Sequence, residues 1–453
     1  MRNYEVEVPV SETNSAIMKE QEKCISCGYC VNVCPPKVYE QQKIGIENNT
    51  DILCISCGQC TNICPVEAIK ERLSYKIVQR VLKNKEEKCV IFSIAPAVRV
   101  ALGEEFGFEV GTNLEHLIPS ALKSIGADYV FDITFGADLT IMEESKEFLN
   151  RLESNEKLPQ FTSCCPAWVK YAEVFYPEYL PNLSTTKSPI AMQSTIMKTL
   201  FASKIKKMPE DIINIVVATF TAKKSEIQRK ELSITKQDTD YVLTTRELAA
   251  LFKEENIDLR NLKPSKFDHP FPVGSGAGVI FGTSGGVTEA AMRTAYYFYT
   301  GVNLKKQELN FQDLRGMNGI KEATITIKDK TVKAAIVSGL KNLDILMEKI
   351  KSKEVSYDFI EVMACPGGCI AGGGQPKSTL LNMQETKKKR MEGLYQEDEK
   401  SHLRLCHQNP SILKLYEKYL QYPGSPLAEE LLHTSYEDKS YLIEGEKYWK
   451  NKS

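Results

Sequence analysis

The chain has 453 residues, of which 42% are hydrophobic, enough for roughly three average domains or for one large α/β unit with a small module. Its 58 Lys and Arg residues against 59 Asp and Glu residues give a net charge of −1, which argues against nucleic acid or an anionic membrane as a partner. The sequence shows no leader and no apolar run of about 18 residues, so we expect a soluble, cytoplasmic protein without membrane contact.

Most of the fourteen cysteines lie in tight groups with metal-ligand spacing, which predicts thiolates in a reducing compartment rather than disulfides. Two groups are copies of one motif, C-x₂-C-x₂-C-x₃-C-P, at 24–35 and 54–65. In this bacterial ferredoxin pattern three thiolates hold one [4Fe–4S] cluster and the fourth binds the other cluster. A zinc site would lack the third cysteine and the Cys-Pro ending. The pattern assigns Cys24, Cys27, Cys30 and Cys64 to one cluster, and Cys54, Cys57, Cys60 and Cys34 to the other.

A basic, helical connector follows the cysteine repeat, and strand-like and helix-like stretches alternate beyond it. The first strand, from Cys89, is a continuous apolar run that ends in a loop containing Pro96, as in a buried parallel strand. Such alternation predicts an α/β fold with parallel sheets covered by helices and with ligands at the carboxyl ends of strands. We expect helices at 116–125, 138–152, 285–300 and 340–350, strands at 128–134, 212–220 and 357–364, a hairpin over 323–337 that turns at Asp329 and Lys330, and a helical segment over 410–432.

Composition also suggests where the domains begin and end. The first residues and the last dozen carry no convincing pattern, and the sequence turns polar and lysine-rich beyond Pro376. We predict an N-terminal tail at 1–20, a ferredoxin-type domain at 21–75, a connector at 76–88, a main domain at 89–395, a C-terminal helical segment at 396–440 and a tail at 441–453.

Two further cysteine pairs lie in loops of the main domain. Cys365 and Cys369 flank Pro-Gly-Gly and precede three glycines, and glycine lets a backbone approach a bulky cluster closely. Cys164 and Cys165 directly precede Pro166, which is placed to open a helix whose positive end favours thiolate. Because neighbouring side chains diverge, we expect only one of this second pair to bind iron.

Three segments in chain order resemble the signature loops of the [FeFe]-hydrogenases. They are Thr-Ser-Cys-Cys-Pro-Ala-Trp at 162–168, Thr-Ala-Lys-Lys-Ser-Glu at 221–226, and Met-Ala-Cys-Pro-Gly-Gly-Cys-Ile-Ala-Gly-Gly-Gly-Gln-Pro at 363–376. The resemblance extends over roughly 20–435, and Ala167, where many members carry glycine, is similar to one divergent branch. It implies a ferredoxin-like 2[4Fe–4S] module followed by a large two-lobed domain that carries the H-cluster, a [4Fe–4S] cubane joined to a diiron subsite with CO, cyanide and dithiolate ligands.

The resemblance also implies roles for individual residues. Cys165 and Cys365 would hold the cubane and Cys369 would bridge it to the diiron unit, while Lys223 would hydrogen-bond a cyanide. Protons would pass from Cys164 through Glu144, Ser184 and Glu147. Without the resemblance, both glutamates read as the solvated face of a charged helix and Ser184 as a turn residue. The residues expected to line the cofactor are Ala95, Pro96, Phe281 and Met363.

One departure from the family pattern concerns the middle loop, which in the family carries the remaining cubane cysteine just before Thr-Ala-Lys-Lys. An ungapped comparison puts Phe220 at that position, and a gapped one leaves three residues missing. The cubane could recruit Cys164, accept an oxygen of Thr219, Thr221 or water, which suits iron–sulfur chemistry less well, or assemble poorly. An altered gene sequence is a further alternative.

Three hypotheses about function follow from this resemblance. The first is a hydrogenase that interconverts H₂ with protons and electrons, passes electrons to ferredoxin or a similar small carrier, and depends on hydrogenase maturation proteins. The second is a non-catalytic iron–sulfur protein, similar to nuclear relatives of the family that serve in cluster delivery or interaction. The third is a redox sensor that uses the same site.

Overall fold

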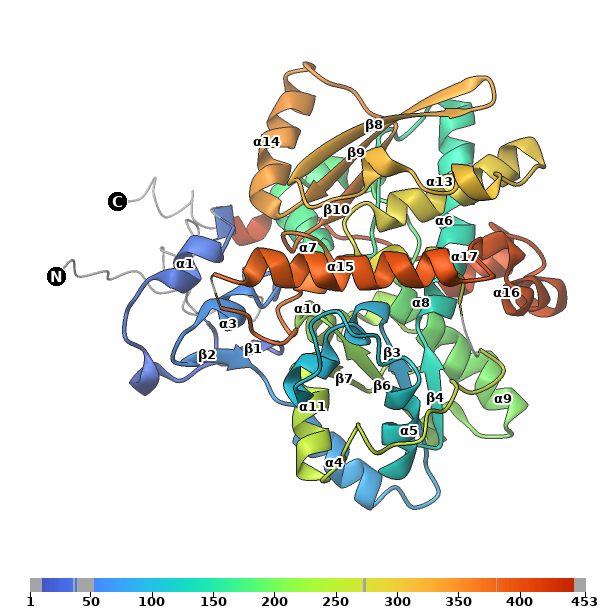
Figure 1. The fold of residues 1–453 in the computed structure, drawn as a ribbon. Coiled ribbons are helices and arrows are strands. Elements are labelled where there is room, and N and C mark those ends of the chain that lie inside the picture. Colours follow the sequence, from blue (N-terminus) through green and yellow to red (C-terminus); the bar gives the residue numbers. More distant parts are fainter. Residues whose placement is uncertain (1–9, 36, 39–52, 272–273, 380, 444–453) are drawn as a thin grey trace.

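The computed structural model describes residues 10–35, 37–38, 53–271, 274–379 and 381–443. A small domain with the cysteine repeat lies beside two larger lobes, each built on one sheet, and helix α15 (Met383–Lys400) crosses the view between the lobes in Figure 1. The predicted α/β fold class, a ferredoxin-like module followed by a two-lobed domain with helix-covered sheets, is confirmed. Among the described helices, none combines the length and apolar character that a bilayer crossing requires.

The first lobe contains a four-stranded, fully parallel sheet in the order β4-β3-β6-β7. Every residue of β3 is buried, as expected of a continuous apolar strand covered on both faces. The predicted strands at 89, 128–134 and 212–220 are confirmed, whereas the sequence analysis missed the edge strand after residue 240. The strands are β3 (Cys89–Ile94), β4 (Tyr129–Asp132), β6 (Ile212–Ala218) and β7 (Tyr241–Thr244).

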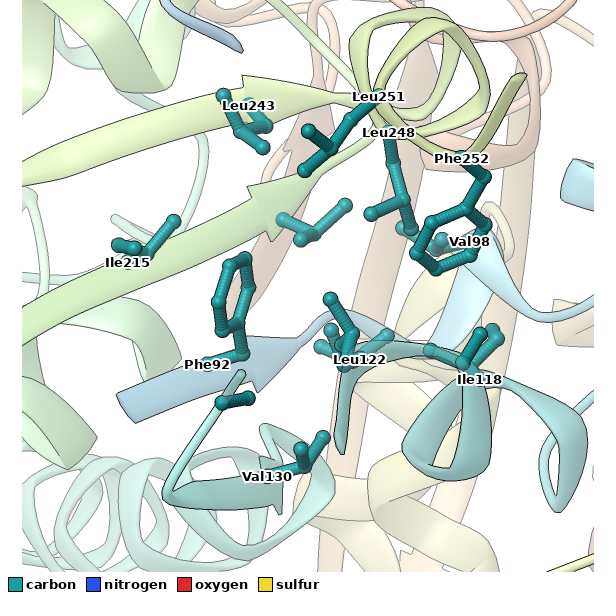
Figure 2. Packing of buried hydrophobic residues seen from close by; sticks show 14 of the residues in the cluster. Phe92, Val98, Ile118, Leu122, Val130, Ile215, Leu243, Leu248, Leu251 and Phe252 are labelled. Atoms are coloured by element: carbon teal, nitrogen blue, oxygen red, sulfur yellow. The ribbon is translucent and has the colours of Figure 1, made fainter. Parts of the chain in front are cut away.

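Helices α4 (Tyr75–Lys83), α5 (Leu117–Ser124) and α11 (Thr245–Glu254) cover one face of this sheet with an apolar core. Figure 2 shows Phe92 of β3 among side chains from α5, α11 and the neighbouring strands. The core residues recur on one face of each helix, so burial of these faces places all three helices on the sheet.

Replacing Phe92 with alanine is expected to lower the free energy of unfolding of this lobe by about 3–5 kcal/mol, because the ring is fully buried and would leave a cavity. Urea denaturation of the iron-loaded protein followed by circular dichroism measures the loss. Leu413→Ala is the control, since Leu413 is 48% exposed and should change stability by less than about 0.5 kcal/mol. Equal losses in the two variants would contradict this account of the core.

The second lobe contains a mixed sheet in the order β5-β10-β9-β8, in which only the β8–β9 pair is antiparallel. The predicted hairpin is present, but the predicted position of its turn is wrong by one residue. Ile327 pairs with Lys330, so the turn residues are Lys328 and Asp329, and Lys328 has the positive φ of 57° that tight hairpins favour. The strands are β5 (Gln160–Phe161), β8 (Ile320–Ile327), β9 (Lys330–Ser338) and β10 (Phe359–Met363).

Helix α6 (Thr134–Ser154) begins earlier than predicted and is not the solvated helix that its charges suggest. It packs between α8 (Pro189–Ile196) and α13 (Gly286–Thr300), and both Glu143 and Glu144 are buried. Glu143 accepts hydrogen bonds from Tyr416 and from the backbone N–H of Gly424. The charged residues of α6 therefore predicted a solvent-exposed helix, whereas tertiary contacts bury much of it.

The predicted helical segment over 410–432 is two helices rather than one. α16 (Pro410–Leu415) continues into a π-turn over 416–420, and α17 (Pro426–Leu432) starts at the second proline of a Pro-Gly-Ser-Pro sequence. Ser425 caps α17 by accepting the N–H of Ala428 at 3.1 Å. α15, which the sequence analysis missed, runs across the predicted boundary at 395. The remaining helices are α7 (Pro166–Phe175), α9 (Ala202–Lys204), α10 (Ala222–Glu226), α12 (Gly276–Val279) and α14 (Leu340–Lys351).

The small domain pairs β1 (Ile17–Lys19) with β2 (Ile69–Glu71) in an antiparallel ribbon. Part of the stretch predicted as an N-terminal tail therefore belongs to this domain, because three residues of it supply a strand. The two cysteine motifs each lead into a short helix, α1 (Tyr29–Val33) and α3 (Gln59–Ile63), through a glycine at φ 73°. The repeat in sequence is thus a repeat in structure. The tail predicted at 441–453 lies largely outside the described residues.

Candidate functional site

The three signature loops meet where strands from both sheets end. Cys165 caps the N-terminus of α7, with Pro166 at its first position as predicted, and Cys365 follows β10. Phe220 and Lys223 follow β6 of the other sheet. Carboxyl ends of parallel strands are the usual place for ligands in α/β folds, and both lobes contribute to this one.

A buried cavity of about 60 Å³ lies between these loops. Its wall is almost entirely apolar, so a bound group would be shielded from water. The sequence-predicted residues that the structure brings together on this wall are Ala95, Pro96, Cys164, Cys165, Lys223, Phe281, Met363 and Cys369. Their binding of a cofactor remains a prediction.

Three thiols of the site lie close enough to affect one another. Burial and the neighbouring thiols of Cys57, Cys165 and Cys369 raise the pKa of Cys365 well above its usual range. Burial and Cys165 likewise raise the pKa of Cys369 to about 12. Buried thiols grouped in this way are stabilised as thiolates only by added positive charge, which iron would supply. The cubane that the sequence analysis predicts would take three of its four thiolates from these cysteines.

Phe220, the residue at the fourth ligand position of the predicted cubane, cannot bind iron. Phe220, which the ungapped comparison puts at the position of the missing cysteine, is 8% exposed and packs in one apolar cluster with Cys165 and Cys369. The hydroxyl of Thr221 donates to the carbonyl of Ser56 at 2.6 Å and is engaged. The hydroxyl of Thr219 is buried, lines the cavity and has no hydrogen-bond partner among the described residues. The residues present therefore do not complete a cubane with thiolates.

Lys223 carries a buried positive charge at the edge of the cavity. Its Nζ donates to Glu226 at 2.8 Å and lies 3.4 Å from the carbonyl oxygen of Cys164. The ammonium is also 5.7 Å from the centre of the Phe220 ring. Lys223 is thus held in place by Glu226 and keeps donor capacity toward the cavity.

The residues of the predicted proton route lie together beneath Cys164. Ser184 donates its hydroxyl to Glu147 at 2.6 Å, and Arg151 donates to the same carboxylate at 2.6 Å. Neither oxygen of Glu144 has a hydrogen-bond partner among the described residues. Burial, with the charges of Glu147 and Glu361, raises the pKa of Glu144 well above its usual range, so this carboxyl keeps its proton to a higher pH than an exposed glutamate.

The cysteines of the two motifs influence one another across the small domain. Burial raises the pKa of Cys34, and the thiols that add to this effect are Cys57, Cys54 and Cys30 in that order. Cys34, the last cysteine of the first motif, therefore lies within electrostatic reach of two cysteines of the second motif. Such proximity is compatible with the arrangement predicted for two neighbouring clusters, and the individual ligand assignments remain predictions.

Sequence reasoning gave no role to Glu361, which lies inside buried strand β10. It accepts the N–H groups of Gly285 at 2.6 Å and Thr288 at 2.8 Å, and so ties α13 to the strand that leads to Cys365. A charged residue within the apolar run Phe-Ile-Glu-Val-Met was the signal that could have indicated it.

Comparison with known proteins gives matches along almost the whole chain. Residues 88–373 match the family described as iron only hydrogenase large subunit, C-terminal domain. Residues 384–439 match the iron hydrogenase small subunit, and 23–90 match a 4Fe-4S dicluster domain.

Individual proteins agree with these matches. Iron hydrogenase 1 of Clostridium pasteurianum is 40% identical over 94% of this chain and 77% of its own length. A variant of apo [FeFe]-hydrogenase HydA1 from Chlamydomonas reinhardtii has a TM-score of 0.70 and 39% identity, covering 81% of this chain and 99% of that one. Cytosolic iron-sulfur assembly component 3 of Mus musculus is 31% identical over 80% of this chain and 78% of its own length.

Proposed function

Because this chain belongs to the iron-only hydrogenase family, we propose that it interconverts H₂ with two protons and two electrons. The matched domains are those that carry two [4Fe–4S] clusters and the H-cluster, and these are the cofactors of the fold. The observation that carries the proposal is the single apolar cavity in which Cys164, Cys165, Cys369 and Lys223 meet.

The chain's own contribution to such a reaction is a dry cavity and a path for protons. Cys164 lies on the cavity wall, Glu144 is buried, and the buried Ser184 donates its hydroxyl to Glu147, which is partly exposed. We infer that protons move along these residues from Cys164 to the surface beside Glu147. A carboxyl with a raised pKa suits this task because it keeps its proton to a higher pH than a free glutamate and can still exchange it.

The proposal includes partners that such chemistry needs. Two clusters in the small domain would carry electrons between the cavity and a ferredoxin or similar small carrier at the surface. Hydrogenase maturation proteins would supply the diiron unit. We place the reaction in the cytoplasm, since free thiols in cluster-ligand spacing are typical of reducing compartments.

Phe220 favours a second candidate function. A non-catalytic iron–sulfur protein of the same fold needs no complete H-cluster, and a phenyl ring at the fourth ligand position is compatible with that role. Similarity to the mouse assembly component supports this alternative. The proton-route residues support the hydrogenase, because an assembly protein needs no buried glutamate with a raised pKa.

Infrared spectroscopy after anaerobic maturation tests the proposed function. A hydrogenase should show CO and cyanide bands and about 14 irons per chain, against about 12 for three cubanes alone. A variant that lacks the bridging thiol, Cys369→Ala, is the control and should lose the bands. If the wild-type protein, supplied with the diiron subsite, shows no such bands, the non-catalytic alternative replaces the hydrogenase.

A further inference from the structure

The small domain and the glycine-rich loop after Cys369 touch through their backbones. A Cβ atom on Gly373 would come within 2.4 Å of the carbonyl oxygen of Cys57 and 2.5 Å of the backbone of Gly58. A Cβ on Gly58 would likewise lie 3.2 Å from the Cα of Gly373. Glycine at both positions therefore permits an approach that no larger residue allows.

Helix α3 reinforces this contact with a row of side chains. Gln59 donates to the carbonyl of Ala371 at 2.9 Å, Thr61 to that of Gly373 at 2.8 Å, and Asn62 to that of Gly372 at 3.1 Å. Three successive carbonyls of the glycine loop thus accept bonds from the helix that carries Cys60. The second cysteine motif, which is predicted to hold the second cluster, therefore packs directly against the loop that follows Cys369.

A single side chain from the first lobe joins all the parts of this junction. Arg246, in the first turn of α11, donates to Asn62 at 2.6 Å and to Thr61 at 2.9 Å on α3. It donates to the carbonyls of Gln375 and Gly373, each at 2.7 Å, in the glycine loop. All of these bonds are formed by one guanidinium, whose planar fork suits several fixed acceptors at once.

The charge of Arg246 is balanced within the same junction. Its Nε and Nη2 donate to the two oxygens of Glu71 on β2 at 2.9 and 2.8 Å. Both side chains are nearly buried, at 12% and 8% exposure, so the pair is little screened by water and orders the groups around it. Removing one partner leaves the other charge buried and unpaired.

We propose that Arg246 is a positioning residue that holds the loop of the second cluster against the glycine loop of the cavity and so fixes the distance over which electrons pass. This inference rests on the proposed function, because an electron path is useful only if the cavity performs redox chemistry. Arg246 is not among the described residues that line the cavity, and its hydrogen bonds run to α3, the glycine loop and β2, so it acts through the two loops that it joins.

The test compares Arg246→Met and Arg246→Lys in the full, cluster-loaded protein, with Arg260→Met as the matched control. Arg260 is exposed, donates to the backbone of a surface turn and lies over the ring of Phe108. Amide hydrogen exchange at 57–64 and 371–375 should be about tenfold faster in Arg246→Met, because a charged hydrogen-bond network is lost. Arg246→Lys should be intermediate, since lysine keeps the charge without the fork.

A second readout separates positioning from general loosening. The ratio of H₂ evolution driven by reduced ferredoxin to D₂/H⁺ exchange at the cavity should fall about tenfold in Arg246→Met, because only the first process uses the path between the loops. If this activity ratio is unchanged while amide exchange is faster, Arg246 does not position the electron path and has only a structural role in joining the two loops. Unchanged amide exchange at both loops would overturn the inference outright. If the wild-type protein shows no D₂/H⁺ exchange, the proposed function fails while the amide-exchange result still decides whether Arg246 joins the loops.

Discussion

Phe220→Cys is expected to raise H₂ evolution per chain by about 100-fold over the wild type, because it completes the thiolate set of the cubane. Phe220 lies on the cavity wall and packs with Cys165 and Cys369, so a thiol at this position would face the same space. Thiolate suits iron–sulfur chemistry far better than the hydroxyls of Thr219 or Thr221. Anaerobic maturation, iron analysis and H₂ gas chromatography measure the gain.

Two further substitutions distinguish the effect of a new ligand at position 220 from the effect of removing the bulky phenyl ring. Phe220→Ala opens the cavity without a ligand and should cost about 3–5 kcal/mol of stability with no gain in iron. Phe220→Ser opens nearly the same space and offers an oxygen. Equal activity of Phe220→Ala and Phe220→Cys would show that space, not ligation, limits the wild type. A wild type as active as Phe220→Cys would mean that the cubane already has a working fourth ligand.

Glu144→Gln is expected to reduce H₂ evolution by about 100-fold or more, the usual contribution of a positioned proton carrier, while making the protein more stable at pH 7. Burial, then the charges of Glu147 and Glu361, raises the pKa of Glu144 far above its ordinary 4.5. The folded chain therefore binds this proton more tightly than the unfolded chain. Raising the pH above 4.5 favours unfolding, at a cost of about 1.4 kcal/mol for each pKa unit of elevation.

Glutamine keeps the shape of Glu144 but does not titrate, so the stability gain should be absent below pH 4 and should grow as the pH rises toward the folded pKa. Thermal unfolding from pH 4 to 8 measures it. Glu143→Gln is the matched control, because Glu143 is buried on the same helix but accepts bonds from Tyr416 and Gly424. That variant should lose stability and keep turnover per folded chain. Loss of stability in Glu144→Gln at every pH would contradict the claim that burial raises the pKa of the Glu144 carboxyl.

The sequence predicted those parts of the site that depend on local patterns. The cysteine repeat, the apolar strand from Cys89 and the strand before Cys365 each follow from spacing or periodicity within about ten residues. The helix opening at Pro166 also follows from a local rule, since proline is favoured at the first helical position. Residues of one signature loop could therefore be placed on the correct end of the correct element.

The parts that could not be predicted depend on contacts between distant segments. Glu143 and Glu144 look like surface residues until Tyr416 and α13 cover their helix. Arg246 lies two residues after an ordinary capping threonine, Thr244, and nothing nearby in sequence indicates that its partners lie in α3 and in the glycine loop. The buried residues of helix α15 recur every four residues, but most of them are polar, so the sequence shows no apolar stripe there.

The strand order of the second sheet determines how late in synthesis on the ribosome this sheet can form. Within its sheet β5 pairs with β10, and β10 lies between β5 and β9, so this sheet cannot close until the chain has been made beyond Met363. All four strands of the first sheet have been made once Thr244 is added, although residues of α16 and α17 later cover one of its faces. Cys164 and Cys165 must therefore wait for Cys365 and Cys369, which are synthesised some two hundred residues later, and the cavity is among the last features of the molecule to form.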